Sequence, residues 1–311
     1  MPPTPLLMDV DTGVDDALAL LLALSSPEVE LVGVSTVAGN VPLQRTTDNT
    51  LRLLQWAGRA DVPVYVGTEQ PLVRDAVAAD DVHGATGLGA AQLPEARTSP
   101  AGDGVEFLLN TLQTRPGEIT LAATGPLTNL ARAETQVPGV LRQARQVVIM
   151  GGAVGVPGNV TPTAEFNFYA DPHAARQVLA SGAELILVGL DVTDQVWLKQ
   201  ADLQACTGPY AAFCQAACES VIAFEAEYYG FAGMRLHDPV ALGAALWPQL
   251  FRTQQLWVDV ETTGELTSGQ LIVDQRALAS DQERLGRPVA CAMEVEQARF
   301  LELFTERVLQ N

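Results

Sequence analysis

Four carboxylates fall within eight residues near the start of the chain, in the run DVDTGVDD at residues 9–16. An apolar run precedes it at residues 6–8, and a second apolar run follows at residues 17–24. We therefore expect the acids at the turn between a first strand and a first buried helix. Like charges this close repel one another, and a fold tolerates them when they lie at a helix N-terminus or bind a cation. The pattern predicts a metal site on an α/β scaffold.

Asp15 and Asp16 are adjacent in the first turn of this predicted helix, so their side chains diverge by about 100°. One of them can face a metal while the other faces a ligand. Hard cations such as Ca²⁺ and Mg²⁺ take carboxylate and carbonyl oxygens and require neither thiol nor imidazole. Helix capping alone would account for one or two of the four acids. The four cysteines contain no C-x-x-C pair, and we expect them to be buried thiols in a reducing compartment.

Two of the three histidines lie in motifs that could carry chemistry. His237 stands in His237-Asp238-Pro239, just before a late predicted helix. Asp238 could cap that helix or could bring a distant carboxylate to the same metal. His83 begins a glycine-rich loop, residues 83–89. A further polar loop at residues 159–167 offers amide and carboxylate groups that suit hydrogen bonds to hydroxyls, although ordinary loop polarity would explain them equally well.

Predicted strands and helices alternate along the first part of the chain. The strands are expected at residues 6–9, 30–37, 62–66, 119–123, 146–150 and 184–190, and the helices at 15–24, 43–56, 104–113, 127–134 and 172–180. This order predicts an open, mostly parallel, Rossmann-like sheet with helices on both faces. After residue 191 we expect helices at 209–229, 239–246 and 296–309 and late antiparallel strands at 255–260, 270–273 and 288–295. We expect one domain, residues 1–311.

Polar or glycine-rich residues follow five of these predicted strands. In open α/β sheets, ligands bind outside the carboxyl ends of the strands. Five such endings together favour a single site at that edge. They are Asp9–Asp11, the run TVAGN at 36–40, the run TGPLTN at 124–129, Gly151-Gly152 and the run DVT at 191–193.

The charge of the chain bears on its partners. The formal net charge is −19, from 37 acids against 18 bases, and Lys199 is the only lysine. Nucleic acid needs a basic footprint and is a poor partner, whereas a small neutral substrate or a cation fits. No apolar run has the length and purity of a membrane span, and no membrane is expected as partner. The first residues have no basic region typical of a signal peptide, so the expected location is cytoplasmic.

Taken in order, these motifs resemble the inosine-uridine-preferring nucleoside hydrolases. The opening signature of that family, Asp-x-Asp-x-Gly-x-Asp-Asp-Ala, is matched from Asp9 to Ala17, and the resemblance extends over nearly the whole chain. Further matching motifs contain Asn40, His83, Thr124, Met150, the run AEFN at 164–167 and the His237-Asp238-Pro239 motif. The resemblance implies the nucleoside hydrolase fold and Ca²⁺-dependent hydrolysis of ribonucleosides to ribose and free base, in nucleoside salvage. It also implies a homodimer or homotetramer.

The resemblance implies a role for each matching residue. The ligands of Ca²⁺ would be Asp11, Asp16, Asp238 and the backbone carbonyl of Thr124. Asp11 would be the general base toward water, and His237 would assist departure of the base. The remaining residues would bind substrate: Asp15, Asn40, Asn159, Glu165 and Asn167 around the ribose, with Met150 packing nearby, His83 near the base and Phe166 also in contact with substrate.

Some positions depart from the family pattern. Thr12 stands where many members have proline, and Ala85-Thr86 replaces a more usual Glu-Ser pair after His-Gly. The segment 225–233 lies where the family places residues that contact the base. Tyr228, Tyr229 or Phe231 could stack there, and we expect Tyr229 at the site. Preference for purine or pyrimidine stays open.

Three other functions compete with this interpretation. One is the same chemistry on a modified nucleoside, and another is a ribose or nucleoside binder without turnover. The third is a Mg²⁺-dependent phosphohydrolase of the haloacid dehalogenase type, which also carries an Asp-x-Asp pair after its first strand. The additional pair Asp15-Asp16 and the lack of a convincing lysine for a phosphate argue against it.

Overall fold

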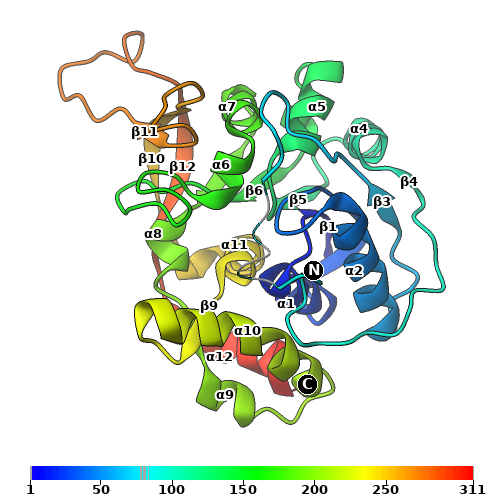
Figure 1. Cartoon of the computed structure of the whole chain (residues 1–311). Helices are drawn as coiled ribbons and strands as arrows, with labels where there is room; N and C mark the ends of the chain where they lie inside the picture. Colours follow the sequence, from blue (N-terminus) through cyan, green and yellow to red (C-terminus); the bar gives the residue numbers. More distant parts are fainter. Residues whose placement is uncertain (1, 78, 80–81, 83, 311) are drawn as a thin grey trace.

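A ten-stranded sheet runs through the computed structural model of the chain, with helices on both of its faces (Figure 1). The structure describes residues 2–77, 79, 82 and 84–310. Along the sheet the strands follow the order β11-β10-β12-β7-β6-β5-β1-β2-β3-β4. The parallel strands are β1 (Thr4–Val10), β2 (Val29–Thr36), β3 (Val64–Val66), β4 (Gly102–Asp103), β5 (Thr120–Ala123), β6 (Gln146–Met150), β7 (Leu185–Val188) and β12 (Arg287–Val295).

Alternating side chains along the central strands supply both layers of the core. On β1, Leu6 and Met8 belong to one buried cluster and Leu7 belongs to the other. On β6, Val148 likewise faces the first cluster and Ile149 the second. Successive side chains of a strand point to opposite faces of the sheet. The continuous apolar runs of these strands therefore reflect a sheet that is covered on both sides, as predicted.

Helices of the two layers connect the parallel strands. They are α1 (Val14–Leu24), α2 (Leu43–Trp56), α4 (Gly104–Thr114), α5 (Thr128–Gln136), α6 (Phe166–Ala170), α7 (Pro172–Ala180) and α8 (Leu190–Thr193). α1 is buried over nearly its whole length, including Asp15 and Asp16 in its first turn. A helix that is apolar all round belongs inside a core. The acids at its start are therefore carried into the interior by the helix that follows them.

The sheet reverses its direction of growth between β1 and β5. From β1 the order continues outward through β2 and β3, whereas from β5 it continues the other way through β6 and β7. β1 and β5 are neighbours, with Asp9 in register with Ala123. Such a reversal opens a crevice at the carboxyl ends of the two strands, where ligands bind in open α/β sheets. The acidic turn after β1 and Thr124 after β5 both lie at this crevice.

The last third of the chain combines a long helix with the remaining strands. Its elements are β8 (Trp197–Lys199), α9 (Gln200–Gln204), α10 (Ala211–Tyr229), β9 (Gly233–Arg235), α11 (His237–Leu246), β10 (Phe251–Val260), β11 (Leu271–Val273) and α12 (Gln297–Phe304), the last followed by a π-helical turn, Thr305–Gln310. β10 pairs antiparallel with β11 and β12, which confirms the late antiparallel strands. β12 pairs parallel with β7 and so joins this part to the main sheet.

Three local predictions were wrong or incomplete. Asp238 does not cap the late helix, because α11 begins at His237 and its N-cap residue is Leu236. The strand expected to continue to residue 190 ends at Val188, and Gly189 starts the short helix α8. The antiparallel pair β8–β9 was not predicted, because its strands have three residues each and lie far apart in the sequence.

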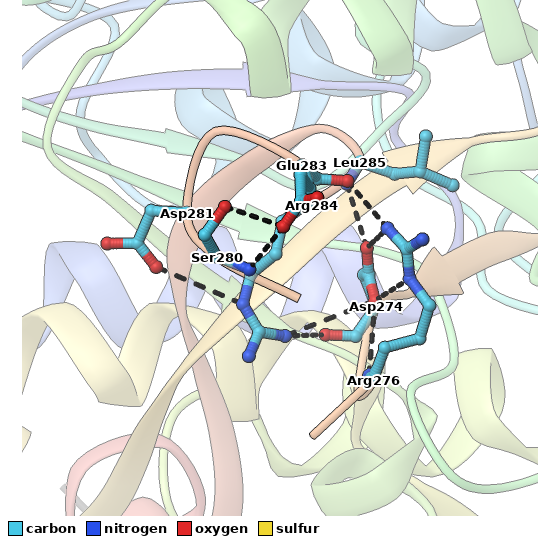
Figure 2. Close-up of polar contacts among 7 residues, drawn as sticks. All are labelled: Asp274, Arg276, Ser280, Asp281, Glu283, Arg284 and Leu285. Carbon is cyan, nitrogen blue, oxygen red and sulfur yellow. Dashed lines mark hydrogen bonds and ion pairs between the residues drawn. The ribbon is translucent and has the colours of Figure 1, made fainter. Parts of the chain in front are cut away.

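The segment between β11 and β12 projects from the sheet as a loop (Figure 1). Figure 2 shows its polar contacts, with Asp274 between Arg276 and Arg284. Arg276 Nη2 lies 2.6 Å from Asp274 Oδ2, and the Leu285 amide donates to the same oxygen at 2.9 Å. Arg284 Nη1 donates to the Asp274 carbonyl at 2.9 Å. One aspartate at the base of the loop therefore holds both ends of the segment together.

Among the helices of the described residues, none combines the length and the apolar character needed to cross a membrane.

Candidate active site

A cavity of about 360 Å³ lies at the crevice above the carboxyl ends of β1, β5 and β6. Eleven of the residues singled out in the sequence line it: Asp15, Asn40, Thr124, Met150, Asn159, Glu165, Phe166, Asn167, Tyr229, His237 and Asp238. They come from seven separate parts of the chain. The structure thus brings the predicted residues to one place. His83 lies outside the described residues.

Three carboxylates form a compact cluster at the inner end of the cavity. Oxygen atoms of Asp15, Asp16 and Asp238 all lie within 4.8 Å of one another, and all three residues are buried. Asp15 and Asp16 come from the first turn of α1, and Asp238 comes from the first turn of α11. Buried carboxylates this close are the oxygen-rich environment that a hard divalent cation requires. The cluster could hold a metal ion.

Asp11 lies beside this cluster. The Asn40 amide donates to Asp11 Oδ2 at 2.7 Å, and the Asn40 side chain donates to Asp16 Oδ2 at 3.1 Å. Asp11 is fully buried, and its Oδ1 has no hydrogen-bond partner among the described residues. A buried carboxylate oxygen without a donor is costly unless something else, such as a cation, compensates it. This oxygen is the observation in the structure that best fits a bound metal.

The turn around Asp16 supplies donors that hold its carboxylate in place. The Gly13 amide donates to Oδ2 at 3.0 Å, and the Thr124 hydroxyl donates to Oδ1 at 2.7 Å. The Thr124 carbonyl, predicted as a metal ligand, accepts from Asn167 Nδ2 at 2.8 Å. A carbonyl has two lone pairs, so this bond leaves it able to bind a cation as well.

Burial and mutual repulsion disfavour the charged forms of these acids. Burial raises the pKa of Asp15 to about 6. Burial and then the neighbouring Asp16 raise the pKa of Asp11 well above its usual range. Burial and then Asp15 do the same to the pKa of Asp238. A bound cation would reverse this tendency, because opposite charge favours the ionised carboxylate.

Glu165 anchors the loop that forms one wall of the cavity. Its carboxylate is the N-cap of α6 and accepts from the amides of Asn167 at 2.8 Å, Phe168 at 3.1 Å and Gly152 at 2.9 Å. Burial nevertheless raises the pKa of Glu165 to about 7. Asn159 stabilises the same loop by accepting from the Phe166 amide at 3.0 Å. The loop after β6 is therefore held in shape before any ligand arrives.

His237 lies on the opposite wall, at the start of α11. Its Nδ1 lies 2.8 Å from the hydroxyl of Thr193, at the end of α8. This contact restrains the Nδ1 edge of the ring and leaves Nε2 on the opposite edge. An imidazole held in this way at a cavity can donate a proton to a bound group.

The outer end of the cavity has a different lining. Phe224 and Tyr229 of α10 lie there with Glu225 and with Arg235 of β9. The sequence had indicated Tyr229, while Tyr228 is 66% exposed and Phe231 packs against Trp197 with ring centroids 4.0 Å apart. Neither of these two aromatic residues is among the cavity lining. Sequence reasoning missed Phe224, Glu225 and Arg235, although the opposite charges of Glu225, which begins the segment 225–233, and Arg235, which follows it, were a usable signal.

Buried carboxylates that could hold a metal ion thus lie at the switch point of an α/β sheet, an arrangement typical of hydrolases. The profile of the family described as inosine-uridine preferring nucleoside hydrolase matches residues 6–302. The chain belongs to this family and is an enzyme of it.

Relatives and solved structures of the family cover nearly the full length of the chain. The chain is 39% identical to the pyrimidine-specific ribonucleoside hydrolase RihA of Enterobacter sp. (strain 638), over 98% of each protein. A plant nucleoside hydrolase superposes with a TM-score of 0.93 at 34% identity, over 99% of each chain. A purine-preferring ribonucleoside hydrolase from Gardnerella vaginalis gives a TM-score of 0.90 at 30% identity, over 98% of each chain.

Proposed function

We propose that this chain hydrolyses the N-glycosidic bond of ribonucleosides, giving ribose and a free base, and that its carboxylate cluster binds Ca²⁺. The observation that carries the proposal is the arrangement of one cavity with two unlike ends. The inner end holds Asp15, Asp16 and Asp238 within 4.8 Å of one another, and the outer end is aromatic and contains Tyr229. A ribonucleoside has the same polarity, with a hydroxyl-rich sugar at one end and a flat base at the other.

The donor set suits calcium. Every candidate ligand is an oxygen: the carboxylates of Asp16 and Asp238 in the cluster, that of Asp11 beside it, and the carbonyl of Thr124. Asp15, the third member of the cluster, is left to bind the ribose. Ca²⁺ takes six to eight such ligands in a flexible geometry, and substrate hydroxyls can complete the set. When bound, the ion supplies Lewis-acid activation of water and orients the sugar hydroxyls.

The side chains of the cavity suit each requirement of glycosidic cleavage. The sugar develops positive charge as the bond breaks, and the carboxylates of Asp15 and Glu165 stabilise that charge electrostatically. Asp11 accepts a proton from the attacking water. Asn40, Asn159 and Asn167 offer amides to the ribose hydroxyls, and Met150 packs below them.

The leaving base gains a proton at the other end of the cavity. Its departure is easier when a ring nitrogen is protonated, and we assign that proton to His237. Phe166 and Tyr229 supply apolar surface on either side. Among the described lining residues, Arg235 is the only lysine or arginine, and it is paired with acids, so a phosphate finds no unpaired basic side chain there. The cavity therefore suits nucleosides over nucleotides.

Release of reducing sugar from inosine, uridine, cytidine and adenosine tests the proposal. Turnover should depend on Ca²⁺, should disappear with EDTA and should be lost in Asp11→Ala. The ranking of the four nucleosides gives the base preference, which relatives named for pyrimidines and for purines leave open. Calcium binding without turnover of any of them would overturn the proposal in favour of a modified nucleoside or a binding role.

From the family resemblance we further propose that the protein forms a homodimer or homotetramer in the cytoplasm. Each chain would form a single nucleoside hydrolase domain. Light scattering of the purified protein tests the assembly, and a mass equal to one 33.1 kDa chain would contradict it.

A further inference from the structure

Arg235 contacts four side chains from three other elements at the outer end of the cavity. Its guanidinium carbon lies 4.4 Å from the ring centroid of Tyr229 and 4.5 Å from that of Trp197. Its nitrogens reach Glu225 and Asp194. The arginine side chain is itself largely buried, with 16% exposure. Arg235 therefore joins α10, β8 and the end of α8 at a single point.

The aromatic contact bears on the orientation of Tyr229. This residue ends α10 and is 54% exposed, so the surrounding core restrains its ring only on one side. A guanidinium packed against an aromatic face is attracted by the ring quadrupole, and its planar shape also fits the ring. The ring of Tyr229, which lines the cavity, is thus held by the Arg235 guanidinium against one of its faces.

The ionic contacts bear on Glu225. This carboxylate is buried in the cavity wall, and Arg235 Nη1 donates to its two oxygens at 2.8 and 3.0 Å. Arg235 Nε lies 3.1 Å from Asp194 Oδ1. A buried acid is costly without a partner, so Arg235 allows Glu225 to remain charged and in place beside the cavity.

The pair β8–β9 fixes the position of Arg235 in turn. Arg235 is in register with Trp197 across this small sheet, and the Leu236 amide donates to the Val196 carbonyl at 3.1 Å. His237 follows two residues later and contacts Thr193. The ladder therefore sets the backbone on which the arginine and the histidine both stand.

We propose that Arg235 is a positioning residue that shapes the base end of the cavity by holding Tyr229 and Glu225, and that the ribose end does not depend on it. This inference rests on the proposed nucleoside substrate. It predicts that loss of Arg235 weakens binding of the base and leaves the sugar and metal sites intact.

The variants Arg235→Met and Arg235→Lys test this inference through a comparison of sugar and nucleoside binding. In Arg235→Met, KM for the preferred nucleoside should rise about tenfold with kcat changed far less, because the lost contacts act on binding. Inhibition by ribose and the affinity for Ca²⁺ should match wild type. Arg235→Lys keeps a positive charge but loses the planar group that stacks on the rings, so its KM should lie between those of wild type and Arg235→Met.

Two further variants separate positioning from general damage to the fold. Arg252→Met removes an exposed arginine that pairs with Glu294 far along the sheet, and it should leave KM and the melting temperature unchanged. The double variant Arg235→Met/Glu225→Gln also removes the buried carboxylate charge that Arg235→Met alone leaves unpaired on Glu225. It should restore the melting temperature and keep the raised KM.

Several results would overturn the inference. They are an unchanged KM in Arg235→Met, an equal loss of ribose and nucleoside binding, or recovery of KM in the double variant. Wild-type protein that binds nucleosides without hydrolysing them would contradict the proposed function alone, whereas protein that binds none would contradict both.

Discussion

The buried carboxylates of the cavity differ in their hydrogen bonding: one is fully held by protein donors, and another keeps an oxygen that a bound ion could satisfy. Asp16 accepts bonds from Gly13, Asn40 and Thr124, so its carboxylate is already oriented. Asp11 keeps one buried oxygen without a donor among the described residues. A metal site needs ligands that are held in the right orientation, as Asp16 is. It also needs an oxygen, such as Asp11 Oδ1, to which no protein donor is bound, so that the ion can bind there without displacing a hydrogen bond.

His237 gives a prediction that separates protonation of the base from cleavage of the sugar. His237→Ala should lower kcat for natural nucleosides by about 100-fold or more, the usual range for loss of a general acid. A riboside whose leaving group is p-nitrophenolate needs no such proton, and its hydrolysis should change little. The measurement is kcat for both substrates in wild type and variant, with Thr193→Ser, which keeps the hydroxyl partner of Nδ1, as the matched control. Equal losses on the two substrates would contradict the assigned role.

The turns after the strands contribute to the geometry of the site together with the first turns of α1 and α11, and glycine permits the close approach of one such turn. A Cβ at Gly39 would lie 2.0 Å from Asp11 Oδ2 and 2.8 Å from Pro126 Cδ. Gly39 lies in the turn after β2, and it lets the backbone touch the carboxylate that Asn40 then binds. The turn therefore requires glycine at this position if Asp11 is to keep its place.

Gly39→Ala should displace Asp11 from its position. We expect a loss of stability of about 1–3 kcal/mol, as for overpacking of a buried site. Calcium affinity and kcat should fall together, because the displaced carboxylate serves both. Calorimetric Ca²⁺ titration and urea unfolding measure the two effects. Wild-type calcium affinity in the alanine variant would show that the turn can move without disturbing Asp11.

The loop between β11 and β12 depends on one carboxylate for its shape. The Arg276 guanidinium, followed by the Leu285 amide, holds the pKa of Asp274 well below its usual range. A depressed folded-state pKa contributes stability above the unfolded value, near pH 4, and that stability is lost as pH falls through the folded pKa. The loop should therefore stay closed at neutral pH and loosen only in acid.

Hydrogen exchange of the peptide containing Leu285 checks this pH dependence. In wild type its amide should be protected at pH 7, and Asp274→Asn should lose that protection. The difference between the two proteins should narrow as the pH falls below about 4, where the unfolded carboxyl is protonated. Asp281→Asn is the matched control, because Asp281 lies 3.9 Å from Arg284 and is 83% exposed. A difference that persists unchanged into acid would argue against Asp274 as the titrating group.

The elements that the sequence revealed are those with local signals. β6 and α7 have the predicted bounds, since a buried apolar run and a proline after Asp171 mark them. β8 and β9 left no such signal, because a strand of three residues is too short to show an alternation of apolar and polar residues. The two strands also lie more than thirty residues apart in the sequence. The same reason hid Arg235 and Glu225, whose role depends on a contact between two elements. Asp238 was found only through its motif, and its place beside Asp15 and Asp16 follows from tertiary packing.

The whole molecule is strongly acidic, with a net charge of −19, and it concentrates buried acids at one cavity. Removal of a bound cation should therefore destabilise the fold as well as stop catalysis. At a Ca²⁺ concentration 100-fold above Kd, binding adds about 2.7 kcal/mol to the free energy of unfolding. EDTA should lower the melting temperature and abolish turnover, and added Ca²⁺ should restore both. Full turnover in EDTA would show that the cluster works without an ion.

Of the three clustered aspartates, Asp15 and Asp16 are neighbours in the sequence, and most of the length of the chain separates them from Asp238. Asp15 and Asp16 are therefore synthesised well before Asp238. β12 is made later still, yet it takes its place between β10 and β7. A nascent chain that stops before residue 238 has no complete cluster, and one that stops before residue 287 lacks a strand inside the sheet. A truncation before residue 238 therefore removes one member of the cluster and should abolish hydrolysis, even where the first strands and helices are already made.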